Sequence, residues 1–341
     1  MTESSEVRGA DPRLTANIYC ADHLDRVVGE VVVPLWRGLE AERAAGRVWL
    51  WCMRYGRGGE HLKIRLHDPE EVLNLDSIKA EIEQSAAELF TALGEPPEDE
   101  DKKNTVRTAV PPIDVEDREK EPREDRSVLF TTYTRHRLSL GDEDMFGSDR
   151  YCVVFTRAIA AACGVYFSSF DAGTKKAAAK RLVTVFTGVT ATLWSLDMDV
   201  ERRASYLAYH RDWLLRFSLV RTDPKVDPAD RSRNRFNQKL MSMAPERRQP
   251  LMEQAWRYED HPMEGDAEGL HKAVVEMAEY AAPKVRALPR ALDPDAQDYF
   301  DSILFKLLQS FANACGLRVL EEAWVHHLLH SAMVFAPARH G

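Results

Sequence analysis

The chain has few cysteines and no long apolar run, and both shortages exclude whole classes of protein. Its 341 residues include only five cysteines, none in a CxxC pair, at positions Cys20, Cys52, Cys152, Cys163 and Cys315. An odd number of scattered cysteines fits a reducing compartment, and it fits neither a disulfide framework nor a zinc knuckle. Because no stretch reaches about 18 apolar residues, no transmembrane helix and no membrane partner are expected.

Targeting signals and several common enzyme signatures are also missing. The polar segment from Met1 to Arg13 lacks the apolar core of a secretory signal, so we expect a cytoplasmic protein. No GxSxG, GxGxxG or GxxxxGK[ST] pattern occurs, which removes the usual support for a serine hydrolase, a dinucleotide enzyme or a P-loop NTPase. The net charge of −9 argues against a nucleic-acid partner, because binding one requires several phosphates to be neutralised together.

The first 94 residues read as an α/β part. After a loose tail, a short strand is expected at 17–20, and a helix is expected from Asp22 to Ala45, kinked or restarted at Pro34. A hairpin follows at 49–67. Asp76 then caps a helix that runs to Leu93.

The middle of the chain is dominated by charge. Residues 95–126 carry 12 acidic and 7 basic side chains among several prolines, which indicates a mobile, charged insertion. Residues 127–140 then resume as extended structure. From about residue 150 onward the apolar residues recur with a helical period. The helices expected there are 150–163, 175–195, 200–219, 230–243, 246–258, 267–282, 296–315 and 317–333. This order predicts an α+β protein, with antiparallel sheet and hairpin elements in the first ~140 residues and a largely helical body at 127–341.

The hairpin at 49–67 is the most unusual stretch. Its second run alternates, with Leu62, Ile64 and Leu66 on one face and only basic or imidazole side chains on the other, namely His61, Lys63, Arg65 and His67. Arg54 enters the turn from the first run. A cationic sheet face can hold an anion or polarise carbonyl groups, although an ordinary solvated face remains the plainer interpretation.

Two helices near the carboxyl terminus carry polar patterns. Ser302, Lys306, Gln309 and Asn313 recur along one face of the helix at 296–315, forming a row of hydrogen-bonding groups suited to peptide amides if that face lines a groove. On the last helix, His326 and His330 share a face beside His327. Their spacing is compatible with zinc, but the HExxH order is absent, so we expect a solvated or capping role and no metal site.

The hairpin sequence WLWCMRYGRGGEHLKIRLH resembles the corresponding hairpin of the lantibiotic dehydratase C-terminal (glutamate-elimination) domain family. The resemblance continues through residues 133–141 and ends at 302–317, so it covers most of the chain as one stand-alone unit. Where the family has a glutamate, an arginine and a helical histidine, this chain has His136, Ser139 and Phe305. Phenylalanine cannot shuttle a proton, as glutamate elimination would require.

With these departures, the chain is similar to the thiopeptide pyridine synthases. That resemblance implies a formal aza-[4+2] cycloaddition between two dehydroalanines of a precursor peptide, followed by loss of water and of the leader peptide as an amide. No cofactor is implied. The implied partner is a dehydrated, azole-containing precursor with an acidic leader, handled by a monomer or homodimer.

The residue roles implied by the resemblance divide between catalysis and substrate binding. Ser302, Lys306, Gln309, His61 and Tyr133 are the expected catalytic residues. Arg54, Lys63, Arg65, Asn313 and His136 are the expected substrate-binding residues. Two other functions remain open: a lyase that eliminates glutamate from glutamylated Ser or Thr, and a non-catalytic scaffold that binds the precursor peptide.

Overall fold

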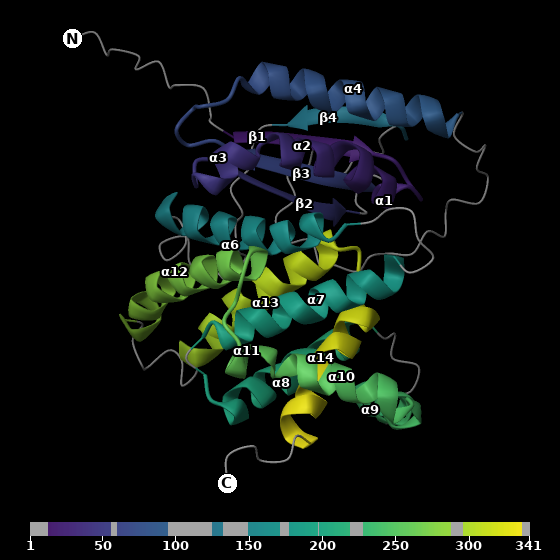
Figure 1. The fold of residues 1–341 in the computed structure, drawn as a ribbon, viewed down its shortest axis with the longest axis vertical. Coiled ribbons are helices and arrows are strands. Elements are labelled where there is room, and N and C mark those ends of the chain that lie inside the picture. Colours follow the sequence, from purple (N-terminus) through teal and green to yellow (C-terminus); the bar gives the residue numbers. More distant parts are fainter. Residues whose placement is uncertain are drawn as a thin grey trace. The chain divides into compact units, whose positions relative to one another are not determined.

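The structure, a computed structural model, describes residues 13–55, 60–94, 125–131, 149–170, 177–196, 198–218, 228–287 and 296–335. These residues form two compact units. Unit 1 contains the described residues up to 94 together with 125–131, and unit 2 contains those from 149 onward. All described strands lie in unit 1, and unit 2 is helical where it is described, which confirms the expected α+β class (Figure 1).

Unit 1 is built on an antiparallel sheet. Its four strands are β1 (Arg13–Tyr19), β2 (Trp49–Tyr55), β3 (His61–His67) and β4 (Ser127–Thr131). They are arranged in the order β2-β3-β1-β4. The expected hairpin is therefore present as β2 and β3, which pair from Trp49 opposite His67 to Tyr55 opposite His61. The turn expected between these two strands and the insertion up to residue 124 lie outside the described residues.

The first strand begins earlier than the sequence indicated. β1 starts at Arg13, at the end of the segment expected to be a tail, and pairs with both β3 and β4. Leu14, Ala16 and Ile18 all point to one buried face, so the period of two begins before the segment that was recognised as a strand.

The helical run after β1 has a wide turn before its proline. It comprises α1 (Leu24–Val27), the π-helix η1 (Val28–Val32), α2 (Val33–Gly38) and α3 (Glu40–Ala44). Pro34 lies in the first turn of α2. A proline has no N–H to donate to the preceding turn, and the π-helical segment accommodates that lost bond. The expected kink or restart thus takes the form of a π turn within a continuing helix.

Helix α4 (Leu75–Leu93) ends where the sequence predicted but is capped by a different residue. The side chain of Asn74 accepts hydrogen bonds from the backbone N–H groups of Asp76 and Ser77. The expectation that Asp76 is the cap is therefore wrong by two positions, because Asn74 holds the extended backbone of an N-cap. The apolar face of α4 is buried through Ile78, Ile82, Ala86 and Leu89.

Unit 2 follows the helical periods of the sequence closely. Its helices are α6 (Asp149–Ser168), α7 (Ala177–Trp194), α8 (Val200–Ser218), α9 (Pro228–Ser242), α10 (Pro245–Ala255), α11 (Arg257–Asp260), α12 (Asp266–Ala287), α13 (Ala296–Ala314) and α14 (Val319–Phe335). The helix expected at 246–258 is divided at Trp256 into α10 and α11. Helix α6 continues five residues past its expected end at Cys163.

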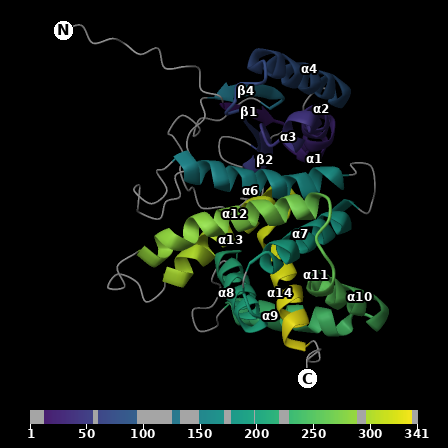
Figure 2. The same cartoon turned by 60° about the vertical axis from the view of Figure 1, so that its left-hand side comes forward.

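Two helix pairs dominate the packing within unit 2, as Figures 1 and 2 show from two directions. Helix α6 lies along α12, where Arg157 pairs with Glu276 at 2.7 Å, and α8 lies along α14. Helices α7 and α13 approach closely at Gly188, where an added Cβ would lie 2.2 Å from Cε1 of Phe311. In the part of the chain that is described, no helix combines the length and apolarity needed to cross a membrane.

Candidate functional site

The two faces of the sheet in unit 1 differ sharply in chemistry. Leu50 and Cys52 of β2, with Leu62, Ile64 and Leu66 of β3, form an apolar face that is buried. The opposite face combines aromatic and basic side chains, here called the sheet platform. Its members are Tyr19 of β1, Trp49, Trp51 and Tyr55 of β2, and His61, Lys63, Arg65 and His67 of β3.

Each basic or imidazole side chain of β3 lies beside an aromatic ring of a neighbouring strand. Lys63 Nζ lies 4.6 Å from the centroid of the Tyr55 ring, and Arg65 Cζ lies 5.1 Å from that of Trp51. The His61 ring stacks on Tyr55 with 14° between planes and also meets Tyr19 at 4.5 Å. Cations at these distances are attracted by the ring quadrupole, by about 2 kcal/mol when water is excluded.

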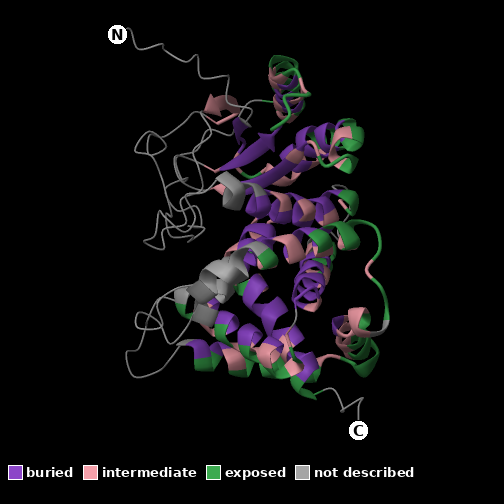
Figure 3. Ribbon diagram, turned by 90° about the vertical axis from the view of Figure 1, so that its left-hand side faces the viewer, coloured by how far each residue is buried: buried purple, intermediate pink, exposed green. Residues whose placement is uncertain are grey.

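Most of the platform is buried, as the sheet in Figure 3 shows, with Trp49 and Tyr55 half-buried. His61, Lys63 and Arg65 are only 2%, 3% and 4% exposed. The plainer interpretation of a solvated face is therefore wrong. Charges removed from water interact with nearby dipoles far more strongly than they do at a wet surface, since less solvent screens them. Such a face is chemically equipped to bind carboxylate or carbonyl oxygens.

Arg54 does not belong to the platform. The alternation of β2 places it on the other face of the sheet, where its guanidinium donates to Asp25 of α1 at 2.6 Å. The structure therefore separates Arg54 from Lys63 and Arg65, with which the sequence had grouped it. Tyr133 and His136 lie outside the described residues.

Helix α13 carries the second set of expected residues, within unit 2. Gln309 is buried at 9% exposure, and Lys306 and Asn313 are half-buried, so this row is not a freely solvated stripe. Ser302 lies on the same helix, but its side chain is outside the described part. The described part of this polar row is therefore at most half exposed to solvent.

Phe305, which takes the place of a helical histidine in the resemblance, packs into an aromatic group. Its ring stacks on the imidazole of His210 of α8, with 4.3 Å between centroids and 10° between planes. Trp213 of the same helix meets it edge-on at 4.9 Å. The position therefore offers a hydrocarbon ring, and the nearest imidazole belongs to a different helix.

The histidines of α14 contradict the expected solvated or capping role. His326 is 0% exposed and His327 is 2% exposed, because this part of α14 is covered on its sides by the other helices of unit 2. Burial, with a smaller contribution from Arg211, lowers the pKa of His326 to about 3 and that of His327 to about 4. Burial also lowers the pKa of His210 to about 3.

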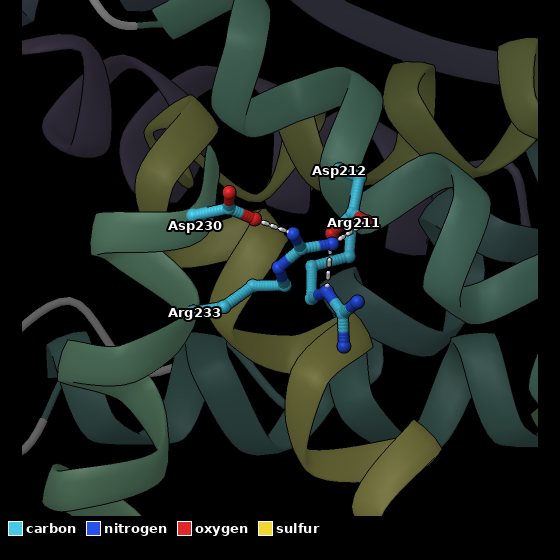
Figure 4. A network of polar contacts seen from close by, with 4 residues as sticks. All are labelled: Arg211, Asp212, Asp230 and Arg233. Carbon is cyan, nitrogen blue, oxygen red and sulfur yellow. Dashed lines mark hydrogen bonds and ion pairs between the residues drawn. The ribbon is translucent and has the colours of Figure 1, made fainter. Parts of the chain in front are cut away.

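Near these histidines lies a network of ion pairs, drawn in Figure 4. The Asp212 carboxylate accepts from Arg211 at 2.7 Å and from Arg233 of α9, and Arg233 also pairs with Asp230. Glu322, one turn before His326, is buried, and desolvation raises its pKa to about 8. Among the residues described, no group of three or more His, Cys, Asp or Glu side chains is arranged to hold a metal ion.

Sequence reasoning found the basic residues of the platform but missed the aromatic side chains that lie beside them. The signal was present, since the alternation in WLWCMRY places Trp49, Trp51, Met53 and Tyr55 on one face of β2. The antiparallel register then sets Trp51 opposite Arg65 and Tyr55 opposite His61. His210 carried no such signal, because only the packing of α8 against α13 and α14 distinguishes it.

Comparisons with known proteins place these elements in a recognised fold. Residues 14–333 match the family model described as lantibiotic biosynthesis dehydratase C-term. The solved structure of the pyridine synthase TbtD from thiomuracin biosynthesis matches 94% of this chain and 97% of its own, with a TM-score of 0.59 and 16% identity. No curated protein matches the sequence.

Two further solved structures share a weaker likeness. The tRNA-dependent lantibiotic dehydratase MibB from Microbispora sp. 107891 matches 97% of this chain but only 28% of its own, with a TM-score of 0.46 and 15% identity. TsrL matches 94% of this chain and 93% of its own, with a TM-score of 0.49 and 12% identity.

Proposed function

Because this chain belongs to the lantibiotic biosynthesis dehydratase C-terminal family, we propose that it matures a ribosomally made precursor peptide as a pyridine synthase. The proposed reaction is a formal aza-[4+2] cycloaddition between two dehydroalanines of one peptide. The likeness to TbtD over nearly the full length of both chains supports this subclass. The reaction would take place in the cytoplasm, where precursor peptides are synthesised.

The buried cations of the sheet platform are the observation on which the proposal rests. Lys63 and Arg65 are held against the rings of Tyr55 and Trp51 in a site with little exposure to solvent. Preorganised positive charge of this kind stabilises oxygen atoms that gain negative character during a reaction. A peptide undergoing cycloaddition presents such oxygens at the amide that tautomerises.

The chemistry requires positioning and proton transfer. The amide preceding one dehydroalanine tautomerises to its iminol, and that C=N joined to the dehydroalanine C=C forms the azadiene. The second dehydroalanine supplies the two-carbon dienophile, and two ring bonds form. Loss of the iminol oxygen as water, and of the leader peptide as an amide, then gives the aromatic pyridine. Holding two distant parts of a peptide together can contribute roughly 7–11 kcal/mol.

The residue roles follow the two units. On the platform, Lys63 and Arg65 bind and polarise peptide carbonyls, and His61 carries a proton. On α13, Ser302, Lys306 and Gln309 hydrogen-bond the amide that tautomerises, and Asn313 extends that row. Tyr133 and His136 lie outside the described residues, and the proposed roles are catalysis for Tyr133 and substrate binding for His136. Arg54 contributes indirectly, by tying β2 to α1 through Asp25.

Glutamate elimination is the alternative, favoured by the description of the family itself. It requires a base for the α-proton and a proton-carrying group near the leaving carboxylate. At the helical position implied by the resemblance, the chain has Phe305, whose ring is packed between His210 and Trp213. This packing counts against elimination, because a hydrocarbon ring in that place transfers no proton.

The decisive experiment incubates the purified full chain with a precursor peptide that carries two dehydroalanines, azoles and its leader. Pyridine synthesis gives a macrocycle with new pyridine absorbance, together with the leader released as an amide, both identified by mass spectrometry. A parallel incubation uses a glutamylated precursor. Free glutamate in that incubation, with no macrocycle in the first, would replace the proposal with a lyase. Tight leader binding without either product would replace it with a scaffold.

A further inference from the structure

Unit 2 encloses imidazoles and a carboxyl group that the proposed reaction does not use. His210 of α8 is 4% exposed, and His326, His327 and Glu322 of α14 are 0%, 2% and 4% exposed. These four side chains are called the buried histidine cluster. Both ring nitrogens of each histidine, and Oε1 of Glu322, have no hydrogen-bond partner among the described residues. Such groups are costly in a packed interior, since each loses its hydration.

The cluster occupies the interface between two helices. Helices α8 and α14 pack extensively against one another. His210 of α8 lies near enough to His326 for a charge on one to oppose a charge on the other, the Phe305 ring stacks on it, and the Tyr206 ring meets it at a tilt. His327 stacks on Trp324 and meets Phe236 of α9 at 5.4 Å. A proton added here therefore places a cation among aromatic rings.

The surrounding charges do not compensate such a cation. On α8, Arg202 lies near His210, and Arg211 lies near His326, His327 and His330, so each of these positive groups opposes protonation. Asp212 favours protonation of His327 and His330, but its carboxylate already accepts from Arg211 and Arg233.

The remaining neighbours add little negative charge. Glu322 is the one carboxyl group of α14 within the cluster, and burial raises its pKa to about 8, so at neutral pH it is mostly uncharged. Tyr206 and Tyr209 present rings to His210, and Phe305 of α13 stacks on it. Asp230 of α9 pairs with Arg233. Among the described residues of α7 and α10, no ionisable group contributes to the shifts of these histidines.

We propose that α8 and α14 form an acid-sensitive latch: protonation of His210 or His326 puts an uncompensated positive charge between the two helices and loosens them from one another. The helix pair α6–α12 of the same unit serves as an internal reference, because its described contact includes the exposed pair Arg157–Glu276 and no member of the cluster. The latch is closed at neutral pH and opens as the pH falls.

The direction follows from proton linkage. His210 and His326 have a folded pKa of about 3, against 6.5 for an ordinary histidine, so the unfolded or opened chain binds more protons between those values. The stability that these two histidines contribute is full above pH 6.5 and decreases progressively as the pH falls toward 3. Each histidine changes the opening equilibrium by about 25-fold between pH 7 and pH 5.

The test measures unfolding equilibria and hydrogen exchange of the full chain at pH 7 and pH 5. In the wild type, once the slower intrinsic exchange at pH 5 is corrected for, the protection factors of amides in α8 and α14 are lower at pH 5 than at pH 7, while those of α6 and α12 are unchanged. His210→Phe and His326→Gln each reduce the pH 5 to pH 7 ratio of the unfolding constant by about 25-fold, because the titrating group is removed. The half-buried His271 of α12 lies outside the cluster, and His271→Phe provides the control for replacing a histidine elsewhere in unit 2.

Two results would overturn the latch. One is a His210 or His326 ring proton that titrates near pH 6.5 in an NMR experiment on the wild-type protein, which needs no variant to fold. The other is equal loss of protection in all four helices at pH 5. Because neither measurement involves substrate, a failed latch leaves the proposed reaction untouched, and an inactive enzyme leaves the latch untouched.

Discussion

The ring of Phe305 lies flat against the imidazole of His210, with centroids 4.3 Å apart and planes 10° from parallel. Through this contact α13, which carries Lys306 and Gln309, is anchored to α8. Phe305→Leu removes the stacked ring but keeps an apolar side chain, and we expect it to cost about 1 kcal/mol of unfolding free energy. Urea denaturation measures the loss. Phe335→Leu is the matched control, since that ring is 74% exposed, and an equal cost for both variants would refute the anchoring role.

Lys63 and Arg65 give the sharpest test of the sheet platform. Replacing either by methionine keeps the apolar stem and removes the charge. If these cations polarise the reacting amide, kcat/KM for pyridine formation decreases by about 10²–10³-fold, as with the loss of other preorganised donors. Product formation is followed by absorbance and mass. Arg37→Met, on an exposed position of α2, changes the same residue type away from the platform and leaves the rate as it was.

Gly188 allows α7 to approach α13. A Cβ at this position would lie 2.2 Å from the fully buried Phe311 ring, so Gly188→Ala forces the two helices apart at a cost of about 1–3 kcal/mol. Gly269→Ala in α12 meets no atom within 4 Å and is expected to stabilise instead, through higher helix propensity. Thermal unfolding compares them. Adding Phe311→Leu to Gly188→Ala recovers part of the loss, and no recovery would contradict the steric explanation.

The side chain of Arg203 caps the carboxyl end of α7. Its guanidinium donates to the carbonyl oxygens of Leu193 and Leu196 and lies 3.8 Å from the centroid of Trp194. Arg203→Lys keeps the charge but loses the planar fork, and we expect a loss of about 1–2 kcal/mol in unfolding free energy. Arg231→Lys, exposed on α9, is the control, with an expected change close to zero. Similar values for both variants would mean that the fork geometry is unimportant.

Glu322 lowers the stability of the fold as the pH rises from mildly acidic to neutral. Its folded pKa of about 8 lies above the ordinary 4.5, so the unfolded chain releases its proton first as the pH rises. Stability is therefore highest below pH 4.5 with respect to this group and is lost between 4.5 and 8. Glu322→Gln removes this loss. Its unfolding free energy, relative to that of the wild type, therefore rises by about 2 kcal/mol from pH 5 to pH 7. Glu279→Gln, exposed on α12, shows no such gain in parallel urea titrations.

The local features of the fold were readable from the sequence. Period-two alternation located β2 and β3, and helical periods located the helices of unit 2, most of them to within two or three residues at each end. The same alternation also indicates which aromatic side chains share the platform face, once the strand register sets Trp51 opposite Arg65. Local cues failed at boundaries, as with Asn74 in place of Asp76, because capping depends on the backbone angles of one residue.

The sequence by itself determined which residues share a face, since that follows from the geometry of a single strand or helix. It grouped Lys63 with Arg65 and aligned Lys306 with Gln309. Only the tertiary structure decided what each face meets: that Arg54 turns away to Asp25, that His326 is buried, and that Phe305 lies against His210. Those contacts join residues far apart in the chain, and their energies depend on burial and neighbouring charge, which no local spacing encodes.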